Sequence, residues 1–178
     1  MQVRVSVRNA SPLLPSTLKG AEQVAGRVFQ RAGIEILWVS CGVGVADEPS
    51  AIGCSEVSFP SHLHLQIISA SRDLSRSAVG AAFLGKENGG CYADLFYEPI
   101  HRLQEVSNVS PAVVLGHAIA HELGHLLLGS NSHSPRGLMR GHWTRHDLED
   151  ASKGRLGFSS EQCLRIAARL ERGETDTR

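Results

Sequence analysis

Residues 112–128 constrain the fold more than any other segment, because the stretch is strongly apolar and yet carries three histidines and a glutamate. Ser110 and Pro111 precede it and are residue types preferred at the start of a helix, while Gly129 follows as a typical helix end. We therefore predict one long helix over this segment. A membrane span needs an uninterrupted run of ~18 apolar residues. The polar side chains break this run, so we expect a soluble domain without a membrane partner.

Length and composition indicate a single globular domain over residues 1–178. The chain has 178 residues, of which 42% are hydrophobic and 20% charged, and both fractions are near the averages for globular domains. The 18 basic and 18 acidic residues give zero formal net charge, which argues against a nucleic-acid partner held by a broad basic field. We expect residues 1–129 to supply a sheet and the long helix, and residues 130–178 an irregular region and a C-terminal helix.

Hydrophobic periodicity predicts the other elements. Residues 2–8 alternate between polar and apolar side chains as a strand does, a helix capped by Ser16 or Thr17 ends at Gly33, and residues 34–39 form a second strand. This order predicts a β-α-β crossover between parallel strands and thus an α/β (α+β) fold. The remaining expected elements are strands over 62–69, 79–84 and 91–97, a short helical piece within 143–151, and a last helix opened by a capping box of Ser159 and Gln162.

His121, Glu122 and His125 form an HExxH motif inside the predicted long helix. Two histidines four residues apart lie on one helix face, so both imidazoles can reach one metal ion. The neighbouring glutamate can reach a metal-bound water without binding the metal, which suits catalysis by zinc. Zinc lowers the pKa of that water from ~15.7 to about 7, and the carboxylate takes the proton during attack on a carbonyl. Because burying these groups without partners is costly, the motif predicts a zinc site.

Two further histidines lie close to the motif in the sequence. His133 follows the helix end at Gly129, so the chain can fold back and present a third nitrogen, and an exposed loop histidine is the alternative. Three protein ligands and one open position are the catalytic arrangement of zinc. His117 lies one turn before His121, where we expect a packed and hydrogen-bonded core residue.

The HELGH segment and its sequel resemble the metzincins, a clan of zinc endopeptidases whose pattern is HExxHxxGxxH followed by a Met-turn. His121, Glu122 and His125 match the motif, and Met139 in Gly-Leu-Met is the Met-turn candidate. The resemblance implies a twisted mixed sheet beside a long active-site helix, and one Zn²⁺ per chain held by His121, His125 and His133. It also implies that Glu122 is the general base and that Met139 forms the floor of the site.

The spacing after the motif departs from that of the clan. Leu128 stands where the clan has glycine, and Asn131 stands where it has the third histidine. Gly129 comes one residue after the clan's glycine position, and His133 comes two residues after the clan's third-histidine position. His133 therefore takes the place of the third ligand if the loop has one extra residue on each side of the glycine. His142 is the second candidate. No tyrosine follows the Met-turn candidate.

Gly80, Ala81 and Ala82 lie in a segment that is similar to the substrate-binding edge strand of matrixins. By this resemblance, the protein is a zinc-dependent peptidase that binds an extended peptide or protein substrate along this strand. One alternative is a non-catalytic zinc module, in which the metal is structural or the cleft only recognises a partner. Another is a zinc hydrolase acting on a non-peptide amide or ester, since the carbonyl chemistry is the same. The fourth ligand of a non-catalytic module could be His117, His142 or Asp147.

Cysteine usage and the N-terminus bear on the compartment. Cys41 and Cys54 bracket a loop of small residues that a disulfide could close, and reduced thiols explain the cysteines equally well. The first residues lack the apolar region of a signal peptide. The stretch HELGHLLLGSNSHSP is similar to one in small bacterial proteins that often carry export leaders, which favours a secreted or periplasmic mature form over a cytoplasmic protein. A monomer is the default expectation.

Overall fold

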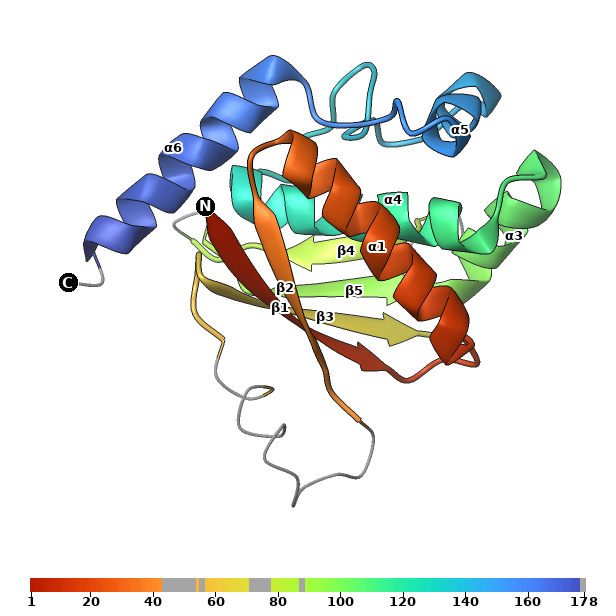
Figure 1. Ribbon diagram of the computed structural model, residues 1–178, viewed down its shortest axis with the longest axis horizontal. Helices are drawn as coiled ribbons and strands as arrows, with labels where there is room; N and C mark the ends of the chain where they lie inside the picture. Colours follow the sequence, from red (N-terminus) through yellow and green to blue (C-terminus); the bar gives the residue numbers. More distant parts are fainter. Residues whose placement is uncertain (43–53, 55–56, 71–77, 87–88, 177–178) are drawn as a thin grey trace.

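A computed structural model describes residues 1–42, 54, 57–70, 78–86 and 89–176 of the chain (Figure 1). Most of the loop that Cys41 and Cys54 bracket lies outside these described residues. The elements follow in the order β1 (Gln2–Asn9), α1 (Pro15–Arg31), β2 (Glu35–Ser40), β3 (His62–Ile68), β4 (Gly80–Phe83), β5 (Tyr92–Phe96), α3 (Tyr97–Ser107), α4 (Pro111–Leu128), α5 (Arg145–Ser152) and α6 (Ser160–Asp176).

The strands of the described residues form one five-stranded mixed sheet in the order β2-β1-β3-β5-β4. β1 pairs in parallel with β2 and β3, and β3 pairs in parallel with β5, whereas β4 at the edge is antiparallel to β5. α1 connects the parallel neighbours β1 and β2, and it packs against α4 (Figure 1). The predicted α/β fold, with its mixed sheet, β-α-β crossover and long helix, is thus confirmed.

The start of α1 differs from the sequence prediction. This helix begins at Pro15, and Leu14 precedes it as an N-cap without a side-chain hydrogen bond. The prediction that Ser16 or Thr17 caps the helix is wrong, because a proline in the first turn fixes a helical φ and has no N–H that needs a cap. At the other end, Gly33 follows the helix with a φ of 77°, in the left-handed region, as predicted for a helix end.

The bounds of α4 and the capping of α6 agree with the sequence prediction. Ser110 is the N-cap of α4, Pro111 opens the helix, and Gly129 ends it with a φ of 61°, although Ser110 makes no side-chain cap hydrogen bond. At the start of α6, the Ser159 N–H donates to Gln162 Oε1 at 2.9 Å, and the Gln162 N–H donates to Ser159 Oγ at 3.2 Å. The capping box is therefore confirmed.

α3 is a helix for which the sequence predicted no element. It begins at Tyr97, where the expected strand over 91–97 ends, and it is followed by Asn108, whose φ of 55° is left-handed. Ile100 is its one buried side chain. Tyr97, Ile100, Leu103 and Val106 recur every third residue, close to helical spacing, so the sequence does carry an apolar pattern for this helix.

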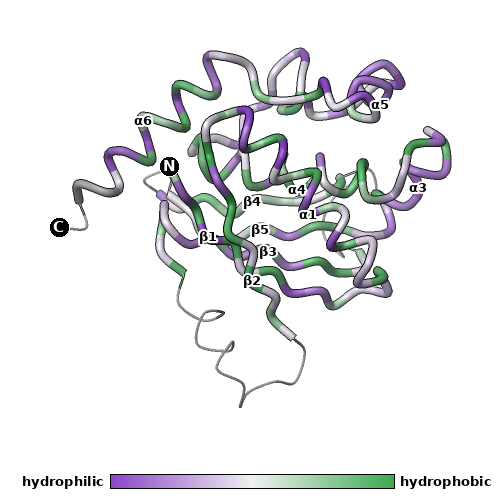
Figure 2. The backbone as a smooth tube through the Cα atoms, viewed as in Figure 1, coloured by the Kyte–Doolittle hydropathy of each residue, from purple (hydrophilic) through white to green (hydrophobic). Residues whose placement is uncertain are grey.

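α4 lies among the hydrophobic residues at the centre of the molecule (Figure 2). Every residue from Val114 to Leu128 is buried. By length and composition α4 could span a membrane, since its 18 residues have a hydropathy of 1.2, but 83% of it is buried inside the protein. Burial on all sides is typical of the core helix of a folded domain.

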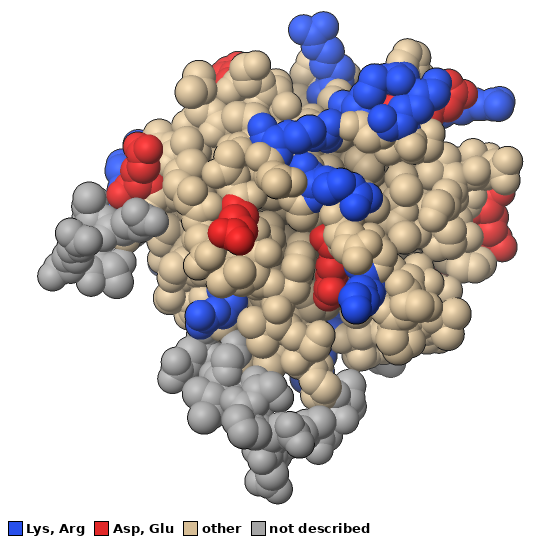
Figure 3. All heavy atoms as spheres, viewed as in Figure 1, with Lys and Arg blue, Asp and Glu red and all other residues tan. Residues whose placement is uncertain are grey.

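The surface carries both signs of charge. On the face shown in Figure 3, acidic and basic side chains both occur and uncharged residues cover most of the area. Around α5 the two signs pair with each other, as Arg145 does with Glu149 at 3.4 Å and Arg155 with Asp150. Exposed pairs of this kind contribute only ~0–1 kcal/mol each, so the fold rests on its apolar core.

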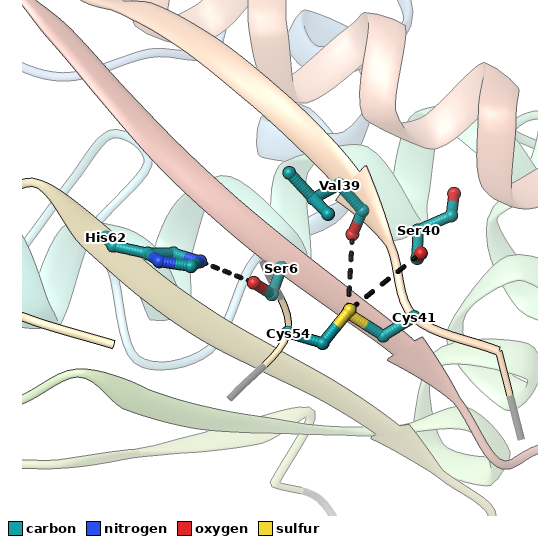
Figure 4. Close-up of a disulfide and its surroundings, with 6 residues drawn as sticks. All are labelled: Ser6, Val39, Ser40, Cys41, Cys54 and His62. Atoms are coloured by element: carbon teal, nitrogen blue, oxygen red, sulfur yellow. Dashed lines mark hydrogen bonds between the residues drawn. A yellow bond between two sulfur atoms is a disulfide. The ribbon is translucent and has the colours of Figure 1, made fainter. Parts of the chain in front are cut away.

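Cys41 and Cys54 are joined by a disulfide, with their Cα atoms 5.9 Å apart. The Cys41 sulfur lies 3.8 Å from the carbonyl oxygen of Val39 at the end of β2 (Figure 4). The structure thereby decides between the disulfide and the free thiols that the sequence left open for this pair. Cys91 and Cys163 are free and partly buried.

Candidate metal centre

α4 places His121 and His125 side by side, one helical turn apart, with their Nε2 atoms separated by 3.0 Å. The Nδ1–H of His121 donates to the carbonyl oxygen of Leu138 at 2.8 Å, and the Nδ1–H of His125 donates to that of Ser130 at 2.7 Å. A hydrogen bond from Nδ1 fixes the ring and leaves the Nε2 lone pair free to bind a metal ion. The local geometry therefore prepares both imidazoles as ligands.

His133 comes from the loop after α4 and joins the two helix histidines. Its ring stacks on that of His121 with the centroids 5.3 Å apart, and it meets the ring of His125 edge to face at 5.0 Å. One nitrogen from each of the three rings lies within 4.8 Å of the others. Elsewhere in the described part of the chain, no three His, Cys, Asp or Glu side chains come together in this way. We call these three residues the histidine cluster.

The loop that carries His133 reverses direction immediately after α4. Gly129 is left-handed, and this conformation lets the chain turn back without the steric cost that a side chain would add. The Ser134 N–H donates to the Met139 carbonyl oxygen at 2.8 Å, which closes the loop around His133. The loop thus brings His133 to the two helix histidines.

Met139 packs against the backbone of α4 within the HExxH segment. Its side chain is buried, and a Cβ placed on Gly124 would lie 2.8 Å from the Met139 sulfur and 2.8 Å from the ring of Phe158. The missing side chain at Gly124 is therefore what allows both residues to approach the helix between His121 and His125.

Trp143 is a site residue that the sequence analysis did not single out. Its indole N–H donates at 3.0 Å to the Leu138 carbonyl oxygen, which also accepts from His121. Its ring lies edge to face with that of His121, with the centroids 5.8 Å apart. The only sequence signal was a tryptophan shortly after the Met-turn candidate, and its contact depends on the conformation of the intervening turn.

Glu122 is buried in α4, with 4% of its surface exposed. Burial raises the pKa of its carboxyl group to about 8. Burial also lowers the pKa of His121 to about 4. Charge repulsion from the neighbouring His125 and His133 adds to this decrease, and the hydrogen bond to the Leu138 carbonyl opposes it. Imidazoles that stay neutral near pH 7 are ready to bind a metal ion, and a nearby cation would favour the ionised form of the Glu122 carboxyl group.

The side chains that could complete a closed zinc site lie outside the histidine cluster. His117 is buried in α4, and its Nδ1–H donates to the Val113 carbonyl oxygen at 2.8 Å, as expected of a packed core histidine. Asp147 completes the capping box at the start of α5, where Thr144 is the N-cap, and it pairs with Arg140 at 3.2 Å. His142 lines a neighbouring cavity. Among the described residues, the cluster therefore offers three protein ligand atoms and no fourth.

A cavity of about 620 Å³ adjoins the cluster at His121. Leu103 and Val106 of α3 form one wall, Val79 lies just before β4, and Trp143 belongs to the segment after Met139. α4 contacts β4 as well as β5, and the outer edge of β4 pairs with no described strand. The candidate metal centre thus lies between an open sheet edge and a largely apolar cavity.

The chain matches no protein-family model, and no curated protein resembles it in sequence. Solved structures with a similar fold include two metal-dependent peptidases. One is a zinc-dependent peptidase from Methanocorpusculum labreanum, with a TM-score of 0.57 and 11% identity over 91% of this chain and 99% of that one. The other is metalloproteinase-II from Bacteroides fragilis, with a TM-score of 0.55 and 11% identity over 96% of this chain and 53% of that one, so this chain spans about half the length of that protein. At this identity the likeness establishes the fold.

Proposed function

We propose that this chain is a zinc-dependent peptidase in which His121, His125 and His133 hold one zinc ion. The proposal rests on the convergence of three histidine nitrogens within 4.8 Å of one another, beside the buried Glu122. Histidine is a common zinc ligand, and three protein ligands with an open position are typical of catalytic zinc. When bound, the zinc would act as a Lewis acid toward water and a substrate carbonyl. The metalloprotease-like fold supports the same reading.

The chain's own residues supply the proton transfer and the orientation. Glu122 takes the proton from a water molecule as that water attacks the substrate carbonyl, and it gives the proton to the leaving amine. Its burial raises the pKa of the carboxyl group, which makes the carboxylate a stronger base. The carbonyl groups of Leu138 and Ser130 hold the two helix histidines in the ligating orientation.

A peptide or protein is the substrate class that fits the surroundings of the cluster. An extended peptide can add to the outer edge of β4 through backbone hydrogen bonds, since that edge pairs with no described strand. A substrate side chain next to the scissile bond would then enter the cavity beside His121. The walls contributed by Leu103 and Val106 favour an apolar side chain there.

The two alternatives are less well supported. A structural zinc module needs a closed set of four protein ligands, whereas the cluster offers three among the described residues and its His133 is exposed. Such a module would also have no use for a buried carboxylate next to its ligands. A zinc hydrolase for non-peptide amides or esters would use the same chemistry, but it would leave the open edge of β4 without a role.

A cleavage assay on the full chain loaded with one equivalent of Zn²⁺ tests the proposal. The protein is incubated with a mixed-sequence peptide library, and mass spectrometry identifies the fragments. Cleavage that a chelator abolishes and added zinc restores would support the peptidase. Zinc binding without cleavage, together with unfolding when zinc is removed, would favour the structural module. Turnover confined to non-peptide esters or amides would favour the second alternative.

A further inference from the structure

Gly80, the first residue of the edge strand β4, lies directly against the side chain of Glu122. A Cβ placed on Gly80 would be 2.6 Å from Cγ and 2.7 Å from Cδ of Glu122, far closer than the ~3.5–4.0 Å of ordinary carbon contacts. The pairing of β4 with β5 sets Gly80 opposite Leu95, which is fully buried. Gly80 thus faces the core side of the sheet, where α4 packs.

Position 80 requires a glycine because there is no room for a side chain, and not because the backbone adopts a conformation that only glycine allows. The glycines with left-handed φ among the described residues are Gly33, Gly129, Gly137 and Gly154, so the backbone at Gly80 is one that other residues can adopt. The contact with Glu122 comes from absent side-chain volume alone. Any larger residue would have to displace the strand or the glutamate.

We propose that Gly80 is a positioning residue for Glu122. Its bare backbone lets the edge strand rest on the glutamate side chain and so fixes the carboxyl group beside the histidine cluster. The inference rests on the proposed function, in which Glu122 is the general base and β4 the peptide-binding edge. β4 would then align the general base with the substrate, because its core-facing side contacts Glu122 and its outer edge binds the peptide.

A purely structural reason for the glycine is the competing explanation. The same Cβ would lie 2.6 Å from the backbone oxygen of Asp94 in β5, so a side chain would also strain the pairing of the two strands. The two contacts can be separated, because replacing Glu122 with alanine removes Cγ and Cδ and leaves the Asp94 oxygen in place.

A double-mutant cycle on the metal-free full chain makes this separation. Melting temperatures are measured for the wild type, Gly80→Ala, Glu122→Ala and the double variant. We expect Gly80→Ala to lower the melting temperature at least twice as much in the wild-type background as in the Glu122→Ala background. An equal decrease in both backgrounds would overturn the inference. If Gly80→Ala does not fold, folding of the double variant supports it, and failure of both variants overturns it.

Gly90 provides a matched control for the cycle. A Cβ on Gly90 would press on the backbone of Phe83 in β4, the strand that Gly80 opens, and its nearest side-chain neighbour would be Leu126, at 3.3 Å. Gly90→Ala should therefore lower the melting temperature equally with and without the Glu122 side chain. Coupling of Gly90 to Glu122 as strong as that of Gly80 would show a general loosening of β4 and would contradict the inference.

The kinetic readout separates positioning from structure. In the zinc-loaded protein, we expect Gly80→Ala to lower kcat for peptide cleavage at least ten-fold, with KM and the bound zinc nearly unchanged. An unchanged kcat, or a loss confined to KM, would contradict a positioning role. If the wild type cleaves no peptide, the proposed function fails, whereas the stability cycle still decides whether Gly80 positions Glu122.

Discussion

The carbonyl oxygen of Leu138 lies 2.8 Å from His121 Nδ1, and it also accepts the indole N–H of Trp143 at 3.0 Å. A single backbone oxygen in the turn before Met139 thus holds a cluster histidine and an aromatic wall of the neighbouring cavity. This arrangement couples the orientation of a proposed metal ligand to the segment that shapes the substrate site.

Trp143→Phe should weaken zinc binding about ten-fold, because it removes the hydrogen bond to the Leu138 oxygen while keeping a ring beside His121. Groups that orient metal ligands typically change metal affinity by ~10–100-fold. Competition with a chromophoric chelator measures the affinity. An unchanged affinity would show that the Leu138 oxygen holds His121 without help from the tryptophan.

His133→Ala should weaken zinc binding by at least roughly 100-fold, because it removes one of three proposed ligands. His142→Ala is the matched control, since His142 belongs to the same irregular region but lies outside the histidine cluster. Its zinc affinity should equal that of the wild type. The ligand assignment would be wrong if the His142 variant lost zinc and the His133 variant retained it.

Leu103→Phe should shift cleavage toward substrates with small side chains, because the larger ring fills part of the cavity beside His121. A single methylene group in an apolar pocket changes discrimination by ~10–200-fold, so kcat/KM for large apolar side chains should fall at least about ten-fold. Leu164→Phe is the control, at an exposed position on α6. Parallel changes for small and large side chains would contradict a role of the cavity in selection.

Asp147→Asn should lower the free energy of unfolding by ~1 kcal/mol near neutral pH, as expected when a helix cap is weakened. Burial acts to raise the pKa of Asp147, but hydrogen bonds from Thr144 and the charge of Arg140 outweigh it, so the pKa lies below its ordinary value of 3.8. This stabilisation is present above the ordinary pKa and is lost as the pH falls through the lowered one.

The difference in the free energy of unfolding between wild type and Asp147→Asn should therefore shrink as the pH falls below 3.8, the ordinary pKa of an aspartate. Urea unfolding at neutral and acidic pH measures it. Glu149→Gln on the same helix is the control, since Glu149 forms an exposed ion pair worth ~0–1 kcal/mol. If the difference in the free energy of unfolding stayed constant over the whole pH range, the charge of Asp147 would not stabilise the start of α5.

The bounds of α4 and the placement of His121 and His125 side by side agree with the sequence prediction, because both signals are local. Pro111 and Gly129 mark the helix ends, and the spacing of His121 and His125 has a fixed geometric meaning on a helix. The start of α1 was wrong for an equally local reason, since Pro15 opens that helix without a side-chain cap.

The features that the sequence did not predict depend on tertiary structure. Leu103 and Val106 of α3 lie at helical spacing in the sequence, but only the packing of α3 beside α4 shows that both line the cavity next to His121. The contact of Trp143 with Leu138 depends on the turn that joins them. The need for a glycine at position 80 arises only when β4 and α4 are packed together.

The most direct test of the proposed peptidase compares wild type and Glu122→Gln, each loaded with zinc, in one peptide-cleavage assay with zinc content measured on the same samples. The amide keeps the shape of the side chain but cannot accept the proton, and loss of a general base typically costs ~10²–10⁴-fold in rate. We predict one zinc per chain in both proteins and cleavage at least about 100-fold slower in the variant. Equal turnover by the two zinc-loaded proteins would contradict the account.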